Sequence, residues 1–434
     1  MTGGLAWVVL WGAFMPGQDQ AARVAIVDGV RTPFAKRHTE FRQLSAVELG
    51  VLCVAELLHR SAMELAWIDQ VVFGQVIPSM LASNIAREVA LDAGLDPRTE
   101  GYSVARACAT SYQSIVSASF ALQARTADCV VAGGADSAST VPVSISAKLV
   151  GILEEVRDAD SWRERAEAVT ELSPSDFKLC TPKLEERSTG LSMGESAEYM
   201  AKANGISRAD QDAFAHRSHV RASAAWDAGK FDEVMPMFVP PDYESTLVRD
   251  NLVRGDSSLD NYAELEPVFD RSYGTLTAGN SSPLSDGASA VLMMREDTAA
   301  ELGLTPLGFV RSHAFVAVDP QDQLLIGPAK ATPIALERAG LGLADLDLID
   351  MHEAFAAQVL SVVRRLEADG VGTIDMDRLN VNGGSIALGH PFAATGARQV
   401  MQTLNELRRR GGGLALCSAC AAGGLAAAIV LEAA

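Results

Sequence analysis

Two cysteines and two histidines stand where their side chains could react. Cys108 lies in RACATSYQSIV, directly before a run of small and apolar residues that predicts a helix. A helix N-terminus offers free N–H groups and the positive end of its dipole, which favour a thiolate. The position suits a nucleophile, although a free cysteine is as often a small member of the core.

His390 lies in NVNGGSIALGHPFAATGAR, between Gly389 and Pro391. This glycine and proline predict a tight turn that holds the imidazole in one direction. A single histidine in a turn is usually structural, but here several glycines allow close backbone approach and a new helix is expected from Ala393. His390 is therefore a candidate general base.

His352 and Cys420 follow two apolar strands. His352, in MHEAF, comes after DLDLID, and sites in α/β sheets gather at the carboxyl ends of strands. Cys417 and Cys420 form a Cys-x-x-Cys pair in ALCSACAAGG, but the sequence holds no second such pair and no HxxxH to complete a zinc site. The pair therefore fits a catalytic thiol backed by a backbone nest better than a metal or redox centre, and no metal is expected.

The elements that must position these residues follow an α/β pattern. Buried strands are predicted at 24–30, 70–76 and 128–135, and helices at 46–61 and 111–125. The last third repeats the scheme, because LADLDLIDMHEAF parallels ELAWIDQVVFGQV and GLALCSA takes the place of DCVVAGG. The sequence therefore predicts two topologically similar halves.

A charged segment separates these halves. Residues 154–187 hold sixteen charged side chains in thirty-four, ten of them acidic, together with two prolines. Such a composition predicts a solvated excursion with helices and no central strand. We predict an N-terminal extension at 1–22, an N-terminal half at 23–140 and 271–298, a loop domain at 141–270 and a C-terminal half at 299–434.

Charge and composition exclude several classes of protein. The 434 residues carry 36 Lys and Arg against 55 Asp and Glu, a net charge of −19 that repels polyanions, so no nucleic-acid partner is expected. No apolar run approaches the ~20 residues of a membrane span, so no stable membrane insertion is expected. The acidic excursion would be repelled by anionic lipid, so only weak attachment to a membrane surface is expected. Six cysteines form no disulfide framework, which favours a reducing, cytoplasmic location.

Taken together, four motifs resemble those of the thiolase superfamily in their order along the chain. RACATS is similar to the nucleophile motif, HEAF to the NEAF or HEAF motif, GHPFAATGAR to the histidine motif and CSACAAGG to the C-terminal cysteine motif. The resemblance spans about residues 23–434 and, with LLIGPAKATPIALERAGL, is strongest to fatty-acid-oxidation thiolases and trifunctional-enzyme β subunits. Ala105 stands where many members have asparagine, and Ala422 where many have glycine. Neither departure removes a reacting side chain.

The resemblance implies a fold and an activity. The fold would be two similar βαβαβαββ halves in a five-layered αβαβα sandwich with an inserted loop domain. The activity would be that of a 3-ketoacyl-CoA thiolase, an acetyl-CoA acyltransferase of fatty acid β-oxidation. Cys108 would attack the 3-keto carbon after His390 removes its proton, and Cys420 would protonate the acetyl-CoA enolate and later deprotonate CoA.

The resemblance also implies binding groups and partners. His390 and a water held by His352 would serve the enolate oxygen, and the backbone N–H groups of Cys108 and Ala422 the second oxyanion. Coenzyme A would be a co-substrate with no bound cofactor, and its arm would lie along three residues of the loop domain and its flanks. These three are Met193, Ser282 and Phe355. The implied partners are a second copy, in a homodimer or dimer of dimers, and a hydratase/dehydrogenase α subunit.

Other functions stay open at this point. Cys108, His352 and His390 would also make the Cys-His-His site of a ketoacyl synthase, but such enzymes obtain their carbanion by decarboxylation and need no acid/base thiol like Cys420. A biosynthetic acetoacetyl-CoA thiolase is the alternative within the family, because one site catalyses cleavage and condensation alike. A non-catalytic protein that binds CoA or lipid on this fold is disfavoured by the retention of both thiols and both histidines.

Overall fold

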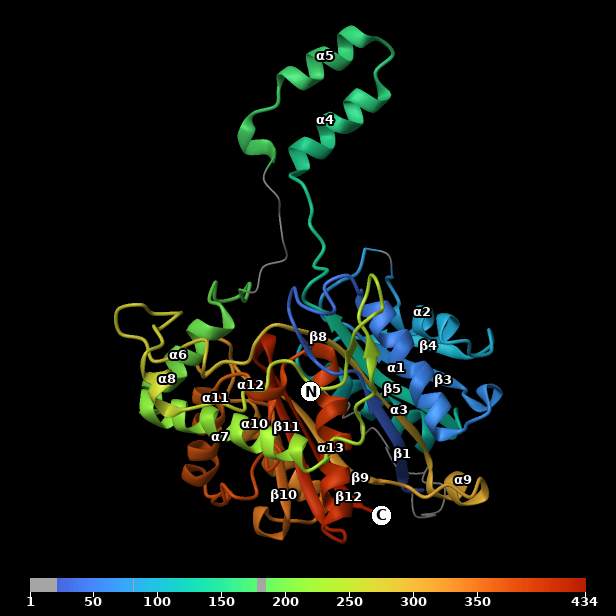
Figure 1. Cartoon of the computed structure of the whole chain (residues 1–434), viewed down its shortest axis with the longest axis vertical. Helices are drawn as coiled ribbons and strands as arrows, with labels where there is room; N and C mark the ends of the chain where they lie inside the picture. The colour runs from blue at the N-terminus through green and yellow to red at the C-terminus, as the bar shows by residue number, and fades with distance from the viewer. Residues whose placement is uncertain (1–21, 81, 178–184) are drawn as a thin grey trace, which may run out of the picture.

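The computed structural model describes residues 22–80, 82–177 and 185–434 (Figure 1). The extension predicted at 1–22 therefore lies outside the described residues except for Ala22. In the described part of the chain, a ten-stranded mixed sheet has the order β10-β11-β12-β9-β1-β8-β5-β3-β4, with β2 paired to β8. Its strands are β1 (Val24–Arg31), β2 (Ala35–Lys36), β3 (Gln70–Gly74), β4 (Glu100–Val104), β5 (Cys129–Ser137), β8 (Ser285–Arg295), β9 (Gly308–Ala317), β10 (Leu348–Met351), β11 (Leu414–Ala421) and β12 (Leu425–Ala433).

The sheet consists of two similar parts. In the first, β3 pairs in parallel with β4 and β5, and β5 continues antiparallel through β8 to β1. In the second, β10 pairs in parallel with β11, and β11 continues antiparallel through β12 to β9. The two parts meet at β1 and β9 through three residue pairs, from Val24↔Val310 to Ile26↔Gly308. The prediction of two similar halves is confirmed, and their edge-to-edge junction was not foreseen.

Helices complete five layers. α1 (Ala46–Ser61) and α2 (Ile85–Asp92) cover the outer side of the first part, while α10 (Pro328–Ala339) and α11 (Ala356–Ala368) lie on the outer side of the second. α3 (Thr110–Gln123) and α13 (Thr395–Arg409) contact each other between the two parts, in a third apolar cluster (Figure 1). The predicted α/β sandwich is confirmed.

The sequence of α1 shows how such a covering helix is specified. Ser45 caps its N-terminus by accepting a bond from the Glu48 amide, and the Glu48 carboxylate accepts the Ser45 amide in return. Leu49, Cys53 and Leu57 recur every four residues and are fully buried against the sheet. The helix ends at Ala62, which adopts a left-handed backbone conformation.

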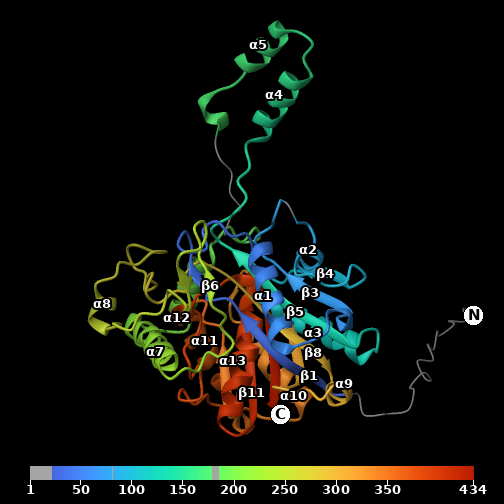
Figure 2. The same ribbon diagram turned by 45° about the vertical axis from the view of Figure 1, so that its right-hand side comes forward.

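The segment between the halves carries helices and two short strands. It holds α4 (Ala147–Asp158), α5 (Trp162–Thr170), α6 (Met193–Ala203), α7 (Arg208–Asp227), β6 (Met237–Phe238), β7 (Thr246–Leu247) and α8 (Leu259–Ala263), and α9 (Glu296–Glu301) follows β8. α4 and α5 form a hairpin that stands away from the body in both views (Figures 1 and 2). None of the nine residues of α5 is buried, in keeping with the predicted solvated excursion. Among the described helices, none has both the length and the apolar content needed to cross a bilayer.

A buried ion cluster joins this segment to β1. The Arg31 guanidinium donates to both carboxylate oxygens of Asp250, at 2.6 and 2.9 Å, and the Phe34 amide donates to the same carboxylate at 2.7 Å. Glu233 lies 3.6 Å from Arg31 Nε. All three charged side chains are buried, so the chain after α7 is held on the sheet by charge-assisted bonds that exclude water.

Candidate active site

Cys108 lies in the turn between β4 and α3, two residues before the helix begins. Ala107 before it has φ of 44°, a left-handed conformation that costs free energy for a residue with a Cβ. The Thr110 hydroxyl stabilises this turn, because it accepts from the Arg106 amide at 2.8 Å and donates to the Ala107 carbonyl at 2.7 Å. Ala105, where the family often has asparagine, is exposed, and Thr110 braces the turn from within the helix.

The N-terminal turns of α3 and α13 touch. The Ala397 amide donates to Ser111 Oγ at 2.9 Å. At Gly396 a Cβ would lie 2.7 Å from Tyr112 Cδ2 and 2.9 Å from the Tyr112 amide nitrogen, closer than non-bonded atoms approach. Glycine at this position therefore permits the contact, which brings the turn of Cys108 next to the segment that carries His390.

Three reactive side chains meet there. Cys108, His352 and His390 each present one nitrogen or sulfur atom within 4.8 Å of the other two, and the imidazole rings lie 4.0 Å apart between centroids. His352 directly follows β10 and its amide donates to the Ser418 carbonyl on β11 at 2.8 Å. The backbone of His390 is fixed by a bond from its amide to Ser285 Oγ at 3.1 Å.

The hydrogen bonds of Thr395 define the tautomer of His390. The Thr395 hydroxyl donates to the Pro391 carbonyl at 3.1 Å and lies 2.7 Å from His390 Nδ1. The hydroxyl can bond to both neighbours at once only if it donates to the carbonyl and accepts from Nδ1–H, which is the assignment we adopt. Nε2 of His390 then carries a lone pair, and this buried atom bonds to no other group of the described residues. Such a nitrogen can accept a proton.

Burial keeps both imidazoles neutral. Desolvation, with the Arg398 charge as a second cause, lowers the pKa of His390 to about 3. Desolvation also lowers the pKa of His352 far below its usual value, with further contributions from His390 and Arg398. Both rings are therefore uncharged at neutral pH.

Cys108 is a thiol in the resting protein. Burial raises its pKa to about 12, with the Asp136 carboxylate adding to the rise, while the backbone amides of Ala422 and of Cys108 itself oppose it. Those two amides are the pair expected to serve an oxyanion, and they lie at the sulfur. Since the thiol does not ionise by itself near neutral pH, it needs a base to become a nucleophile.

Alkylation should report this raised pKa. We expect the rate of Cys108 modification by iodoacetamide to rise steadily from pH 7 to pH 10, because the thiolate fraction keeps growing below a pKa of about 12. An unperturbed thiol, with a pKa of ~8.5, would level off within that range. Peptide mapping at each pH gives the rate for Cys108 alone, and a rate that levels off before pH 10 would contradict the raised pKa.

Cys420 lies near the end of β11 and is fully buried. Burial raises its pKa well above the usual value, and the neighbouring Cys108 raises it further. Cys417, three residues earlier, belongs to the apolar cluster on the other side of the strand and lies 3.4 Å from Thr403 Oγ1. Side chains three apart on a strand face opposite ways, so this pair cannot share a metal ion.

The trio of Cys108, His352 and His390 is the group of described side chains whose atoms could jointly approach a soft cation. Their atoms all lie within 4.8 Å of one another. The expectation of no metal stays a prediction.

A cavity of about 390 Å³ is lined by Ile386, from the segment that leads to His390, and by none of Cys108, His352, His390 and Cys420. Ser282 lines it, and the Ser282 amide donates to the carbonyl of Ala354, within the HEAF motif, at 3.0 Å. Its basic lining residues are Lys36, His219 and Arg254, which sequence motifs did not single out.

The other two residues expected along the CoA arm do not line this cavity. Met193 is partly buried against an apolar cluster that includes Phe355. Phe355 stacks edge-on with Phe269 at 5.9 Å between ring centroids. The structure thus places Ser282 at the cavity and these two side chains in the neighbouring core.

Several residues that build the site were missed in the sequence. Asp136, on β5, accepts from the amides of Val76, Ile77 and Ala393 at 2.7 to 3.0 Å, and burial raises its pKa to about 7. Thr395 lies within the recognised GHPFAATGAR segment, so its hydroxyl was visible there. Asp136 gave no such signal, because its importance comes from the chain segments that fold around it.

Comparison with known proteins agrees with this architecture. The models of the thiolase N-terminal and C-terminal domains match residues 24–297 and 304–433. The 3-ketoacyl-CoA thiolases of Shigella flexneri serotype 5b and Escherichia coli O139:H28 are 52% and 53% identical over 426 residues, covering 95% of this chain and 98% of theirs.

Solved structures show the same relation. The Bacillus anthracis acetyl-CoA acetyltransferase superposes with a TM-score of 0.84, and human mitochondrial 3-ketoacyl-CoA thiolase with 0.83. Each is 32% identical, and the match covers 95% of this chain and 99% of the other. The chain belongs to the thiolase family.

Proposed function

We propose that this thiolase cleaves a 3-ketoacyl-CoA with CoA, releasing acetyl-CoA and an acyl-CoA shortened by two carbons. The observation that carries the proposal is the meeting of Cys108 with His352 and His390, next to Cys420, at the boundary between the two halves. The names of the relatives support the same substrate class, and a human neighbour was solved in complex with CoA. Coenzyme A is accordingly a co-substrate.

The first half-reaction uses both thiols. His390 Nε2 takes the proton of Cys108, and the thiolate adds to the 3-keto carbon while the amides of Cys108 and Ala422 stabilise the oxyanion. Collapse of this intermediate breaks the C2–C3 bond, which leaves the acyl group on Cys108 and the electron pair in the enolate of acetyl-CoA. The Cys420 thiol then protonates C2. The raised pKa of Cys420 keeps this proton in place until the carbanion forms.

The second half-reaction restores the enzyme. The Cys420 thiolate takes the proton of an incoming CoA, whose sulfur attacks the acyl thioester on Cys108. The tetrahedral intermediate releases the new acyl-CoA, and the Cys108 thiolate recovers its proton from His390. Cys420 acts as an acid in one half and as a base in the other, a role that a ketoacyl synthase does not need.

Direct assay tests the proposal. Purified protein should release acetyl-CoA from acetoacetyl-CoA and from a longer 3-ketoacyl-CoA, in each case only when CoA is added. Failure to cleave either substrate would overturn the assignment. Faster turnover of acetoacetyl-CoA, with acetyl-CoA condensation at a comparable rate, would instead favour the biosynthetic thiolase.

Replacement of Cys420 by alanine should separate the two halves. We expect acylation of Cys108 by a simple acyl-CoA to survive, because His390 still takes the Cys108 proton and the departing CoA thiolate can be protonated by solvent. Exchange of the C2 hydrogens of acetyl-CoA with deuterium should fall at least ~100-fold, the lower end for loss of a positioned acid or base. Mass spectrometry measures both the acyl group on Cys108 and the deuterium content of acetyl-CoA. Cys417→Ala is the matched control, and exchange at the wild-type rate in Cys420→Ala would remove Cys420 from the mechanism.

We further propose a homodimer, or a dimer of dimers, acting in the cytoplasm. Among the described strands, β4 pairs only with β3, so its outer edge is free to meet a second copy. The cysteines of the described residues are free thiols, as suits a reducing compartment. The outward α4–α5 hairpin offers a surface for a hydratase/dehydrogenase subunit.

A further inference from the structure

A chain of buried polar groups lies behind His352. His352 Nδ1 is 2.8 Å from Ser385 Oγ, and the Arg398 guanidinium donates to the same oxygen at 3.1 Å. All three side chains have no exposed surface. None of the steps above uses Ser385 or Arg398, and neither touches the reacting atoms of the substrate.

Counting hydrogen-bond donors and acceptors assigns the hydrogen positions in this series of buried side chains. Arg398 has only donors, so it occupies one lone pair of Ser385 Oγ. The hydroxyl hydrogen of Ser385 must then find an acceptor, and among the described residues the remaining partner is His352 Nδ1. The reverse assignment, with Nδ1–H donating to the serine, would leave the hydroxyl hydrogen buried and unbonded, at a cost of about 1–3 kcal/mol.

We propose that Ser385 and Arg398 are positioning residues that hold His352 in the tautomer with hydrogen on Nε2. Nε2 faces the site and is buried without a partner in the described chain. In this tautomer it donates a hydrogen bond, either to the enolate oxygen or to a water that binds it. His390 has the opposite tautomer because Thr395 accepts from its Nδ1. The Ser385 hydroxyl thus makes His352 Nε2 a hydrogen-bond donor, and the Thr395 hydroxyl makes His390 Nε2 a base.

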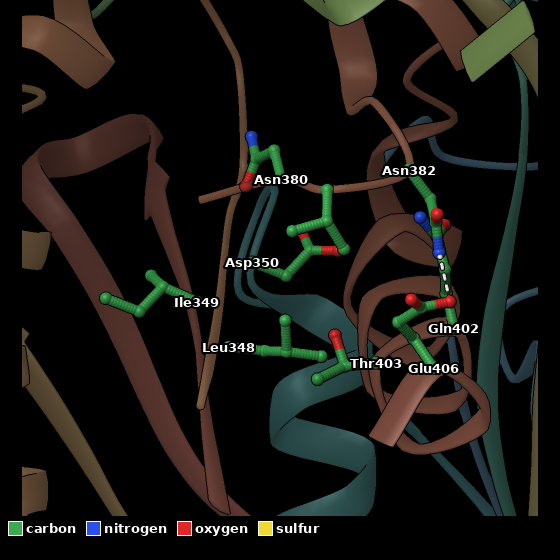
Figure 3. A pocket seen from close by; sticks show the side chains of 9 residues that line it. Leu348, Ile349, Asp350, Asn380, Asn382, Gln402, Thr403 and Glu406 are labelled. Carbon is green, nitrogen blue, oxygen red and sulfur yellow. Dashed lines mark hydrogen bonds between the residues drawn. The ribbon is translucent and has the colours of Figure 1, made fainter. Parts of the chain in front are cut away.

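The anchoring of Arg398 explains why its direction is fixed. Its other terminal nitrogen lies 3.4 Å from Asp350 Oδ2 and 3.4 Å from Gln402 Oε1. Asp350, two residues before His352, also accepts from the side-chain Nε2 of Gln399 at 2.8 Å. Asp350 also lines a cavity of about 10 Å³, about the size of one water, together with Asn380 and Gln402, whose side chains are drawn in Figure 3. The guanidinium is therefore held on two sides while it points at Ser385.

The inference rests on the proposed function and predicts which step depends on Ser385. The N–H donor of His352 acts on the enolate oxygen. It takes no part in the proton transfer from Cys108 to His390 that precedes acylation of Cys108. In Ser385→Ala the enolate step, measured as deuterium exchange at C2 of acetyl-CoA, should slow about tenfold, equivalent to ~1.4 kcal/mol. Acylation of Cys108 by acyl-CoA should change less than twofold, and Ser385→Thr should restore exchange because it keeps the hydroxyl.

Nitrogen NMR tests the tautomer without any substrate. With ¹⁵N-labelled histidine, His352 is assigned by the signal that disappears in His352→Asn. We expect protonated Nε2 and unprotonated Nδ1 in the wild-type protein, and a growing Nδ1–H population in Ser385→Ala. A purely structural role for Ser385 would lower stability without changing this ratio. Ser312→Ala is the matched control, since it removes another buried hydroxyl, bonded to the Ala335 carbonyl at 2.6 Å.

The outcomes separate this inference from the proposed function. A wild-type protein that neither exchanges nor cleaves would refute the function, while the NMR result would still decide the tautomer. Wild-type His352 with hydrogen on Nδ1 would overturn the inference. So would a Ser385→Ala variant that exchanges at the wild-type rate, or one that loses acylation and exchange equally.

Discussion

Replacement of Cys108 by alanine is expected to abolish covalent acyl transfer. The sulfur is the one atom of the site that would bond to the acyl group, and His390 would be left with no nucleophile to activate. Removing the nucleophile of a serine protease costs about 10⁶-fold in turnover, and we expect a loss of at least ~10⁴-fold here. The fold should be unchanged, because Cys108 lies in a turn and is only half-buried.

Intact-mass measurement after incubation with acyl-CoA checks this result. Wild-type protein should gain one acyl group, and Cys108→Ala should gain none. Cys129→Ala is the control, since Cys129 is also a free thiol, buried at the start of β5, and its loss should leave acylation intact. An acyl adduct on Cys108→Ala would place the nucleophile elsewhere.

Asp250→Ala should give the largest loss of stability among single substitutions of charged residues outside the site. It leaves the Arg31 guanidinium buried with only Glu233 nearby, and it removes the acceptor of the Phe34 amide. Breaking a buried ion pair by deleting one partner costs about 3–5 kcal/mol. We therefore expect the unfolding transition in urea to shift to clearly lower concentrations.

Asp227→Ala is the control for this measurement. Asp227 pairs at 3.2 Å with Arg249, the residue before Asp250. The side chains of Asp227 and Arg249 are both about half exposed or more. Pairs of this kind contribute about 0–1 kcal/mol, so the transition should barely move. Equal shifts for the two variants would show that burial adds nothing to the Arg31–Asp250 pair.

The sequence singled out the candidate groups because each lies within a local pattern, and the structure brings Cys108, His352 and His390 together. A cysteine before an apolar helix and a histidine after a strand are visible in a few residues, and strands and helices set their direction. Cys420 was distinguished from Cys417 only through the resemblance of CSACAAGG to a family motif, and the structure adds that the two side chains lie on opposite faces of β11. Strand and helix positions differ from prediction by only a few residues, as in α3, which begins at Thr110 instead of Ser111.

Other parts depend on contacts between distant segments. The tautomers of His352 and His390 follow from Ser385, Arg398 and Thr395, and only the folded chain shows which hydroxyl meets which ring nitrogen. Met193 and Phe355 were expected along the CoA arm, yet apolar residues can line a cavity or fill a core, and the sequence does not distinguish these environments. The junction of β1 and β9 depends on pairing across almost three hundred residues.

Cys108 comes from one half of the molecule, whereas the two histidines and Cys420 come from the other. Neither half alone therefore encloses the full set of groups. During refolding, the helices and strands of each half depend mostly on closer neighbours, while the turns of α3 and α13 meet only after the halves dock. After dilution from denaturant, the rate at which turnover recovers thus reports the docking of the halves. The rate at which the far-ultraviolet circular dichroism signal recovers reports the folding within each half.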